Sequence, residues 1–125
     1  MSAPLEAFLS SRMKFPGLAA WSLRLPDRTV RSQSYATWVP VPRAEQVLGR
    51  LALAADGLQY HNVKPRRLCW KFEHVRFHLA LGVDGSCLAV VIQTSREQSR
   101  AVTEAVLEEF VRLWDSVPHH SGGRP

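Results

Sequence analysis

Apolar residues recur along the chain with two different periods, and these periods predict helices and strands in alternation. Residues 4–13 and 42–61 carry apolar side chains three or four positions apart, which is the spacing of one helical face. Residues 18–25 alternate instead, with Trp21 and Leu23 on one side of the chain, as in a half-buried strand. The first half of the chain is therefore predicted to contain two helices with at least one strand between them.

Two further segments separate that strand from the long middle helix. Pro26 and Asp27 are typical of a turn, and residues 29–34 (TVRSQS) predict a second strand whose polar composition suits a sheet edge. Residues 35–41 (YATWVPV) predict an irregular connector, and Pro42 suits the first turn of the middle helix.

Residues 66–93 predict three antiparallel strands, the first two of which are joined at Glu73 and His74. This turn places Trp70 opposite Phe77 and gathers the large apolar side chains on one face, predicted to be the core face. The other predicted pairs are Phe72 with Val75, Leu68 with Leu79, Cys69 with His78, and Lys71 with Arg76.

Asp84 and Gly85 predict a two-residue hairpin turn between the second and third of these strands. The resulting pairs are Leu81 with Leu88, Leu79 with Val90, and Phe77 with Ile92, all on the core face. The opposite face then holds Ala80, Ala89 and Val91 together with the basic residues. A shift of one residue would move every side chain of the third strand to the other face.

The last helix is predicted to begin at a capping box formed by Thr94 and Glu97 and to end near Val117. Residues 1–117 are expected to form a single domain, and residues 118–125 a flexible tail. The complete order is α-β-β-α-β-β-β-α, which predicts an α+β domain with helices packed on an antiparallel sheet.

Composition is that of an ordinary globular domain, and the charge adds one clue to function. Of the 125 residues 46% are hydrophobic and 22% charged, which is too apolar for a disordered protein. The formal net charge is +5, and residues 1–76 hold 12 Lys or Arg against 5 Asp or Glu. A basic surplus favours contact with anionic surfaces, including nucleic acid and acidic proteins, without choosing between them.

The cysteine content and the N-terminus are those expected of a cytoplasmic protein. Cys69 and Cys87 are too few for a disulfide framework. The N-terminal residues lack the regions of a signal peptide and carry Glu6 where its apolar region would lie. The longest uncharged apolar run, residues 87–92, is too short to cross a bilayer, so we expect no transmembrane segment.

The basic hairpin at residues 64–76 is a candidate for nucleic-acid binding. Its basic residues are Lys64, Arg66, Arg67, Lys71 and Arg76. Binding of single strands needs exposed aromatic rings beside the cations, but the predicted register turns Trp70 and Phe72 towards the core. Nucleic acid is therefore the lesser hypothesis, while Arg67, Lys71 and Arg76 are candidate contacts for an anionic partner.

The pairing of Lys71 with Arg76 sets two like charges opposite each other, which is unfavourable. A carboxylate of the middle helix, such as Glu45 or Asp56, would relieve the repulsion, and so would an acidic partner.

No catalytic, metal or cofactor site is predicted. Cys69 and His78 oppose each other, but zinc needs three or four ligands and His74 lies apart from them at the turn. The chain contains no nucleophile elbow and no phosphate-binding glycine loop. We therefore expect a protein that is not an enzyme and needs no cofactor.

The order of the elements resembles the roadblock family, which includes the roadblock-type dynein light chains and bacterial and lysosomal GTPase-regulating proteins. The resemblance covers residues 4–117: Phe15, Pro16 and Gly17 lead from the first helix into the first hairpin, and VRFHLALG, VDGS and CLAVVIQ precede the last helix. The polar second strand and the connector YATWVPVP depart from the usual pattern and leave the subfamily open.

This resemblance implies a roadblock-like, profilin-like fold with a five-stranded antiparallel sheet in the order 2-1-5-4-3 and helices on both faces. It also implies a homodimer, or a heterodimer with a relative, formed through the middle helix and the third strand. Such proteins serve as platforms for Ras-like small GTPases or as adaptors, not as enzymes.

Apolar residues of the middle helix and the third strand form the predicted dimer interface. Leu53 lies off the main apolar stripe of the helix, and an uncovered apolar edge strand invites pairing with another chain. The predicted interface residues are Leu48, Leu51, Leu53, Leu58, Leu68, Cys69 and Trp70. The alternatives are a nucleic-acid-binding module that uses the basic hairpin and, ranked last, a small enzyme or ligand-binding domain.

Overall fold

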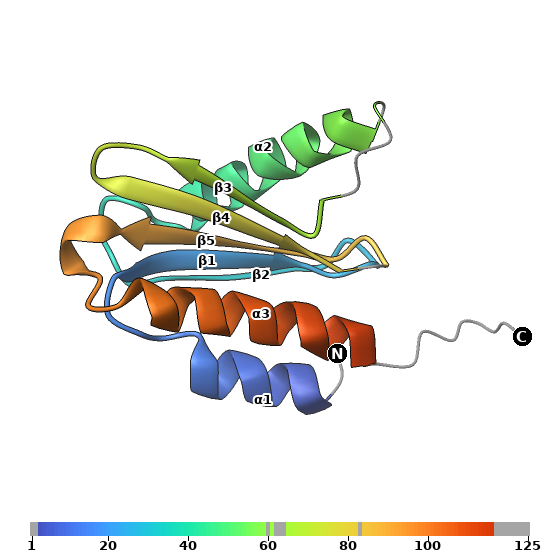
Figure 1. The fold of residues 1–125 in the computed structure, drawn as a ribbon, viewed down its shortest axis with the longest axis horizontal. Coiled ribbons are helices and arrows are strands. Elements are labelled where there is room, and N and C mark those ends of the chain that lie inside the picture. Colours follow the sequence, from blue (N-terminus) through green and yellow to red (C-terminus); the bar gives the residue numbers. More distant parts are fainter. Residues whose placement is uncertain (1–2, 60, 62–64, 83, 117–125) are drawn as a thin grey trace, which may run out of the picture.

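One antiparallel sheet lies between two layers of helices. The computed structural model describes residues 3–59, 61, 65–82 and 84–116. The elements are α1 (Ala3–Arg12), β1 (Leu18–Arg24), β2 (Val30–Ser34), α2 (Val41–Gln59), β3 (Arg67–Lys71), β4 (Val75–Leu81), β5 (Cys87–Gln93), the 3-10 turn η1 (Thr94–Arg96) and α3 (Arg100–Ser116). Figure 1 shows α2 on one face of the sheet and α1 beside α3 on the other.

The five strands lie in the order β2-β1-β5-β4-β3, which confirms the predicted topology. The two central strands, β1 and β5, are buried on both faces along almost their whole length, as their nearly continuous apolar sequences LAAWSL and CLAVVI require. Among the described residues, no helix has the length and apolar character needed to cross a membrane.

The larger core lies between the sheet and the helices α1 and α3. Phe110 of α3 is fully buried, and its ring centroid lies 6.0 Å from that of Phe8 in α1. The buried members of this core are Leu5, Phe8, Leu9, Met13, Leu18, Trp21, Leu23, Ala80, Leu88, Val90, Ile92, Val106, Leu107, Phe110 and Val111. Each large side chain contributes about 2 kcal/mol by leaving water, so this layer fixes both helices on the sheet.

The smaller core lies under α2, where small side chains let the helix approach the sheet closely. Leu48, Leu51, Ala52 and Ala55 of α2 pack on Leu79, Cys87 and Ala89 of the sheet. A neighbouring group combines Val39 and Ala44 with Ala19, Ala20 and Val91.

The register between β3 and β4 is the predicted one. Trp70 lies opposite Phe77, Leu68 opposite Leu79, Cys69 opposite His78, and Lys71 opposite Arg76. The Phe72 amide donates to the Val75 carbonyl at 2.9 Å and closes the turn around Glu73 and His74.

The register between β4 and β5 differs from the prediction by one residue. Leu81 pairs with Cys87, Leu79 with Ala89, and Phe77 with Val91. Leu88, Val90 and Ile92 therefore point towards α1 and α3, while Ala89 and Val91 point towards α2. These faces are the reverse of the predicted ones, as a shift of one residue demands.

The cause is a hairpin loop one residue longer than predicted. The Gly82 amide donates to the Ser86 carbonyl at 2.9 Å, and the Gly85 amide donates to the Gly82 carbonyl at 3.2 Å. Gly85 has φ of 92°, and Asp84 Oδ1 accepts hydrogen bonds from the Ser86 amide at 3.1 Å and hydroxyl at 2.7 Å. This is a three-residue hairpin loop with a left-handed third residue, in place of a two-residue turn.

The β1–β2 hairpin uses the same loop without the glycine. The Leu25 amide donates to the Thr29 carbonyl, the Arg28 amide donates to the Leu25 carbonyl, and Asp27 Oδ1 accepts from the Thr29 amide. Arg28 occupies the left-handed position, with φ of 73°.

The capping-box prediction at Thr94 and Glu97 is wrong. Residues 94–96 form the separate turn η1, and α3 begins only at Arg100. Glu97 follows η1, and its carboxylate bonds to Arg76 and Thr103 instead of a helix amide. The predicted helix end at Val117 and the tail at residues 118–125 lie outside the described residues, as does Lys64 of the predicted basic hairpin.

The two hairpin loops predict opposite effects of exchanging glycine and a larger residue. Gly85→Ala should lower the free energy of unfolding by about 1 kcal/mol, because an L-residue is strained at this φ although a Cβ there meets no atom within 4 Å. Arg28→Gly should raise it by up to about 1 kcal/mol by removing that strain. Urea unfolding of both variants provides the measurement, and effects of equal sign would contradict the shared geometry.

Candidate functional site

The strand β3 forms one edge of the sheet and offers its outer backbone groups to another chain. The Phe72 amide donates to the Val75 carbonyl, and the Leu81 amide donates to the Arg66 carbonyl. In β3, the backbone groups that face β4 are therefore those of the even-numbered residues. The antiparallel alternation then leaves the N–H and C=O groups of Arg67, Cys69 and Lys71 pointing away from β4. Such an edge can add a further strand.

On the face of the sheet that carries α2, the helix leaves the β3–β4 hairpin partly uncovered. The helix packs mainly on β1, β2 and β5. Phe72 is 57% exposed, and its ring lies 5.3 Å from that of Phe77, centroid to centroid. Leu68 and Trp70 are half-buried beside them. An aromatic strip therefore runs along the edge of the sheet next to α2.

The residues predicted to form a dimer interface fall into two groups. Leu48 and Leu51 are only 3% and 7% exposed and belong to the core beneath α2, so their side chains are not available to a second chain. Leu53 is 71% exposed on the outer side of the helix. Leu58, Leu68 and Trp70 are partly exposed, and Cys69 is exposed on the edge strand.

On the outer side of α2, the residues one turn on either side of Leu53 have no side chain. Gly49 and Gly57 lie one turn before and one turn after it, and a Cβ at either glycine would meet no atom within 4 Å. The buried alanines of this helix, Ala44, Ala52 and Ala55, face the sheet instead. An apolar side chain between two glycines gives a helix surface that another helix can approach closely.

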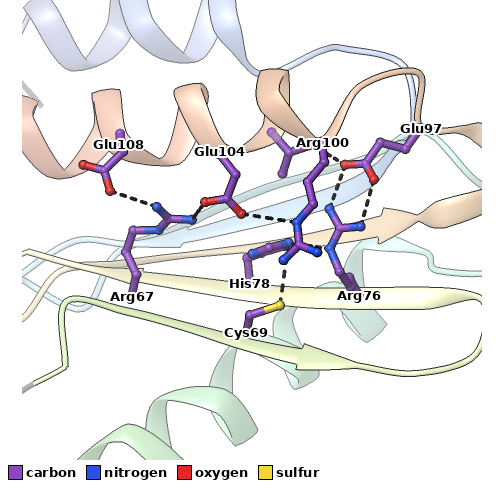
Figure 2. A network of polar contacts seen from close by, with 9 residues as sticks. Arg67, Cys69, Arg76, His78, Glu97, Arg100, Glu104 and Glu108 are labelled. Carbon is purple, nitrogen blue, oxygen red and sulfur yellow. Dashed lines mark hydrogen bonds and ion pairs between the residues drawn. The ribbon is translucent and has the colours of Figure 1, made fainter.

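On the opposite face of the sheet, Arg76 is buried in an ion pair. Its guanidinium donates two hydrogen bonds to Glu97, to Oε1 at 2.8 Å and to Oε2 at 2.7 Å, and both side chains are 7% exposed. The Thr103 hydroxyl of α3 donates to the same carboxylate at 2.6 Å. Figure 2 shows Arg76 rising from β4 to meet Glu97 at the start of the α3 layer.

His78 completes the buried part of this network as a neutral imidazole. It is 1% exposed, and its Nε2 accepts a hydrogen bond from Arg76 Nε at 3.0 Å. Burial, followed by the charge of Arg76, lowers the pKa of His78 to about 4. The Cys69 sulfur lies 4.0 Å from the same ring nitrogen.

Arg67 forms a second set of ion pairs between the edge strand and α3. Its guanidinium donates to Glu108 at 2.8 Å and to Glu104, which also lies 3.7 Å from Arg100. Burial raises the pKa of Glu104, but the hydrogen bond and charge of Arg67 outweigh it and leave that pKa below its ordinary value. Hydrogen bonds from Arg76 likewise lower the pKa of Glu97. Both carboxylates are thus held in their charged form.

These contacts correct the predicted basic surface. Arg76 is buried and paired, so it is not a contact for an anionic partner, and the acid opposite it is Glu97, not Glu45 or Asp56. Arg67 is occupied by two glutamates. Lys71 alone of the three predicted contacts is an exposed cation without an ion pair in the part of the chain that the structure describes.

The sequence contains no signal for the acidic half of the network. The pattern around Glu97 predicts a helix cap, while Glu104 and Glu108 share the face of α3 that turns towards β3. Their spacing of four residues is the one available hint that they act together. Within the described ranges, no three His, Cys, Asp or Glu side chains lie close enough to hold a metal ion.

The sheet order and the distribution of helices over its two faces define a roadblock-type α+β fold. By sequence, the chain matches no family model and no curated protein.

Solved structures with this fold come from several bacteria. The gliding protein MglB of Thermus thermophilus matches with a TM-score of 0.66 and 15% identity, over 94% of this chain and 95% of that one. A structure of MglB with a tetrameric arrangement matches with a TM-score of 0.60 and 15% identity, over 92% and 93%. The Roadblock/LC7 domain of Streptomyces avermitilis matches with a TM-score of 0.58 and 16% identity, over 89% and 97%.

Removal of one partner from the buried ion pair should lower the free energy of unfolding far more than removal of one partner from an exposed ion pair. Glu97→Gln should lower the free energy of unfolding by about 3 kcal/mol, because Arg76 stays buried without its counter-charge. Glu109→Gln breaks the exposed pair with Arg12 and should cost less than about 1 kcal/mol. Chemical denaturation at pH 7 measures both effects, and equal losses would contradict the buried pair.

The same variant should change the response to acid. The folded state lowers the pKa of Glu97. The Glu97 carboxylate therefore adds to the free energy of unfolding at pH values above its pKa in the unfolded chain, and this stabilisation is lost as pH falls through its pKa in the folded protein. The wild type should therefore lose its advantage over Glu97→Gln below about pH 4. Denaturation repeated across a pH series measures this loss, and an advantage that stays constant down to about pH 2 would contradict it.

Proposed function

We propose that this protein is a non-enzymatic homodimeric scaffold in which residues 1–117 act as one roadblock-like domain. Two copies pair through β3 and α2 and present a continuous surface to a Ras-like small GTPase or its regulatory complex. The observation that carries the dimer is the partly exposed strip of Leu68, Trp70, Phe72 and Phe77 beside an open strand edge.

A second copy fits this edge because the exposed groups are self-complementary. A two-fold axis through Cys69, the middle residue of β3, pairs the outer backbone groups of Arg67 with those of Lys71 of the second copy. The α2 helix of each subunit then brings Leu53 towards the aromatic strip of the other. The strip would thereby leave water, as in the apolar centre of a stable interface.

The polar network makes this pairing electrostatically tolerable. Antiparallel pairing places Arg67 near a lysine of the second copy, and like charges in that position repel. Glu104 and Glu108 already neutralise Arg67 within each subunit. The strand edge can therefore meet its copy although its sequence, RLCWK, is basic.

The proposal of a GTPase partner is based on the similarity of this fold to the roadblock-type structures. The roadblock family implies platforms for Ras-like GTPases, and the structural matches include the gliding protein MglB. The carboxylates that the structure gathers between β3, β4 and α3 are engaged in ion pairs with Arg67 and Arg76, which favours a scaffold over an enzyme.

A charge on the outer side of α2 should separate the two subunits. Leu53→Glu should give a monomer by light scattering at concentrations where the wild type is a dimer, because the interface would bury an unpaired carboxylate. Val102→Glu is the matched control, because this residue is also exposed, at 43%, but lies on α3. A wild-type monomer at about 100 μM, well above the Kd of a stable dimer, would contradict the proposal.

Cys69 provides a second measurement of the same prediction. A short bis-maleimide should link two wild-type chains through Cys69, since it lies at the proposed axis, while Cys87 is fully buried and remains unreactive. Cys69→Ser should abolish the cross-link, and Leu53→Glu should reduce it strongly.

The partner requires a separate experiment. Purified Ras-like GTPases, each loaded with GDP or with a non-hydrolysable GTP analogue, should include one that binds the wild type in a nucleotide-dependent way. Its affinity for the Leu53→Glu monomer should fall about tenfold or more, because the platform is built from both subunits. Failure of every GTPase to bind in either state would leave the dimer but remove the partner.

A further inference from the structure

A second surface, unrelated to the dimer edge, lies where β1 begins and β5 ends. There a hollow of about 420 Å³ is lined by Gly17 and Leu18, by the connector from Tyr35 to Trp38, by Gln93 at the end of β5 and by Arg96 of η1. This volume lies in the range typical of ligand sites. The hollow includes no residue of β3, and β3 is the strand at the other edge of the sheet from β2.

Its aromatic wall is fixed in place. The Tyr35 hydroxyl donates to the Met13 carbonyl at 2.6 Å and accepts from Trp21 Nε1 at 3.3 Å. Trp38 is 41% exposed, and its Nε1 donates to Gln93 Oε1 at 3.4 Å. An exposed tryptophan with an anchored ring offers a large contact area at low entropic cost.

Arg96 is the one charged residue among the described residues that line the hollow. Among the described residues, Arg96 has no acidic group within ion-pair distance. The Lys14 ammonium lies 5.7 Å from the centre of the Tyr35 ring. The neighbouring Glu97 is turned away, because Arg76 and Thr103 occupy both its oxygens.

Gly17 maintains this arrangement of backbone. It has φ of 96°, and a Cβ at this position would lie 2.7 Å from the Glu97 Cα. The chain after β5 therefore passes directly over Gly17, which brings Arg96 to the hollow while its neighbour Glu97 points into the protein.

The hollow continues towards an open strand edge. Tyr35, Ala36 and Thr37 also border a shallower depression with Pro40 and Val41, where Val41 is 36% exposed. The Tyr35 amide donates to the Ala19 carbonyl, so the odd-numbered residues of β2 form the backbone hydrogen bonds to β1. The N–H and C=O groups of Val30, Ser32 and Ser34 therefore point away from β1. Ser34 ends the strand at the depression.

We propose that this surface binds an extended acidic segment of a partner protein. The segment lies along β2 and places a carboxylate on Arg96, with an adjacent apolar side chain against Trp38 and Val41. Strand addition supplies affinity through the backbone, and the hollow supplies the preference for acid. A charge-assisted bond to a guanidinium is the strong polar contact available to such a ligand.

Two capped peptides of equal length test this proposal, one alternating Asp with Leu and its control alternating Asn with Leu. Amide shifts of the isotope-labelled protein should change on addition of the Asp peptide at residues 30–38 and at Arg96. The Asn peptide should bind about tenfold more weakly or worse, and Arg96→Gln should reduce affinity for the Asp peptide by a similar factor. Trp38→Ala should weaken both peptides.

Arg112→Gln is the matched control, because it removes the same charge from an exposed position on α3. It should leave the affinity unchanged within about twofold. The proposal is overturned by an equal loss in Arg112→Gln, by shifts confined to β3, or by no saturable shift below about 1 mM peptide. It is also overturned if inorganic phosphate or a short oligonucleotide binds Arg96 more tightly than the Asp peptide does.

Discussion

The buried pairing of Arg76 with Glu97 determines how the parts of this protein meet. It joins β4 to the segment after η1, and through Thr103 it fixes the first turns of α3. Because the guanidinium is buried, its charge must be matched at that place and in that geometry. The ion pair therefore ties β4, the neighbour of the edge strand β3, to the segment that carries Arg96.

The sequence predicts the elements of this fold well where a local signal is strong. The turn at Glu73 and His74 gives the register of β3 on β4, because the alternation of Leu68, Trp70 and Phe72 has one consistent partner set. The same reasoning fails on β5. Both faces of that strand are apolar, so the side-chain pattern fits either register, and the choice falls to the hydrogen bonds of Asp84 in the loop.

The polar network could not be predicted, because its members are distant in sequence. Arg67 bonds to residues 37 and 41 positions later, and Arg76 to one 21 positions later. Part of the basic surplus of residues 1–76 is matched inside the molecule, because Arg12, Arg67 and Arg76 all form ion pairs with acids that come after residue 96. A charge imbalance between two halves of a chain can thus be a means of folding one half onto the other. It need not mark a surface for an external anion.

The strand order has a geometric consequence for assembly. If two subunits pair through β3 as proposed, the two β2 strands would become the outer strands of a ten-stranded sheet, because β2 lies at the other edge of each sheet. They are then separated by nine strand spacings, or about 40 Å. A flexible chain with two acidic segments would need a linker of roughly 50 residues to reach both ends at its relaxed length. Such a dimer would bind most tightly those partners in which the linker between the two acidic segments matches the distance between its two β2 strands.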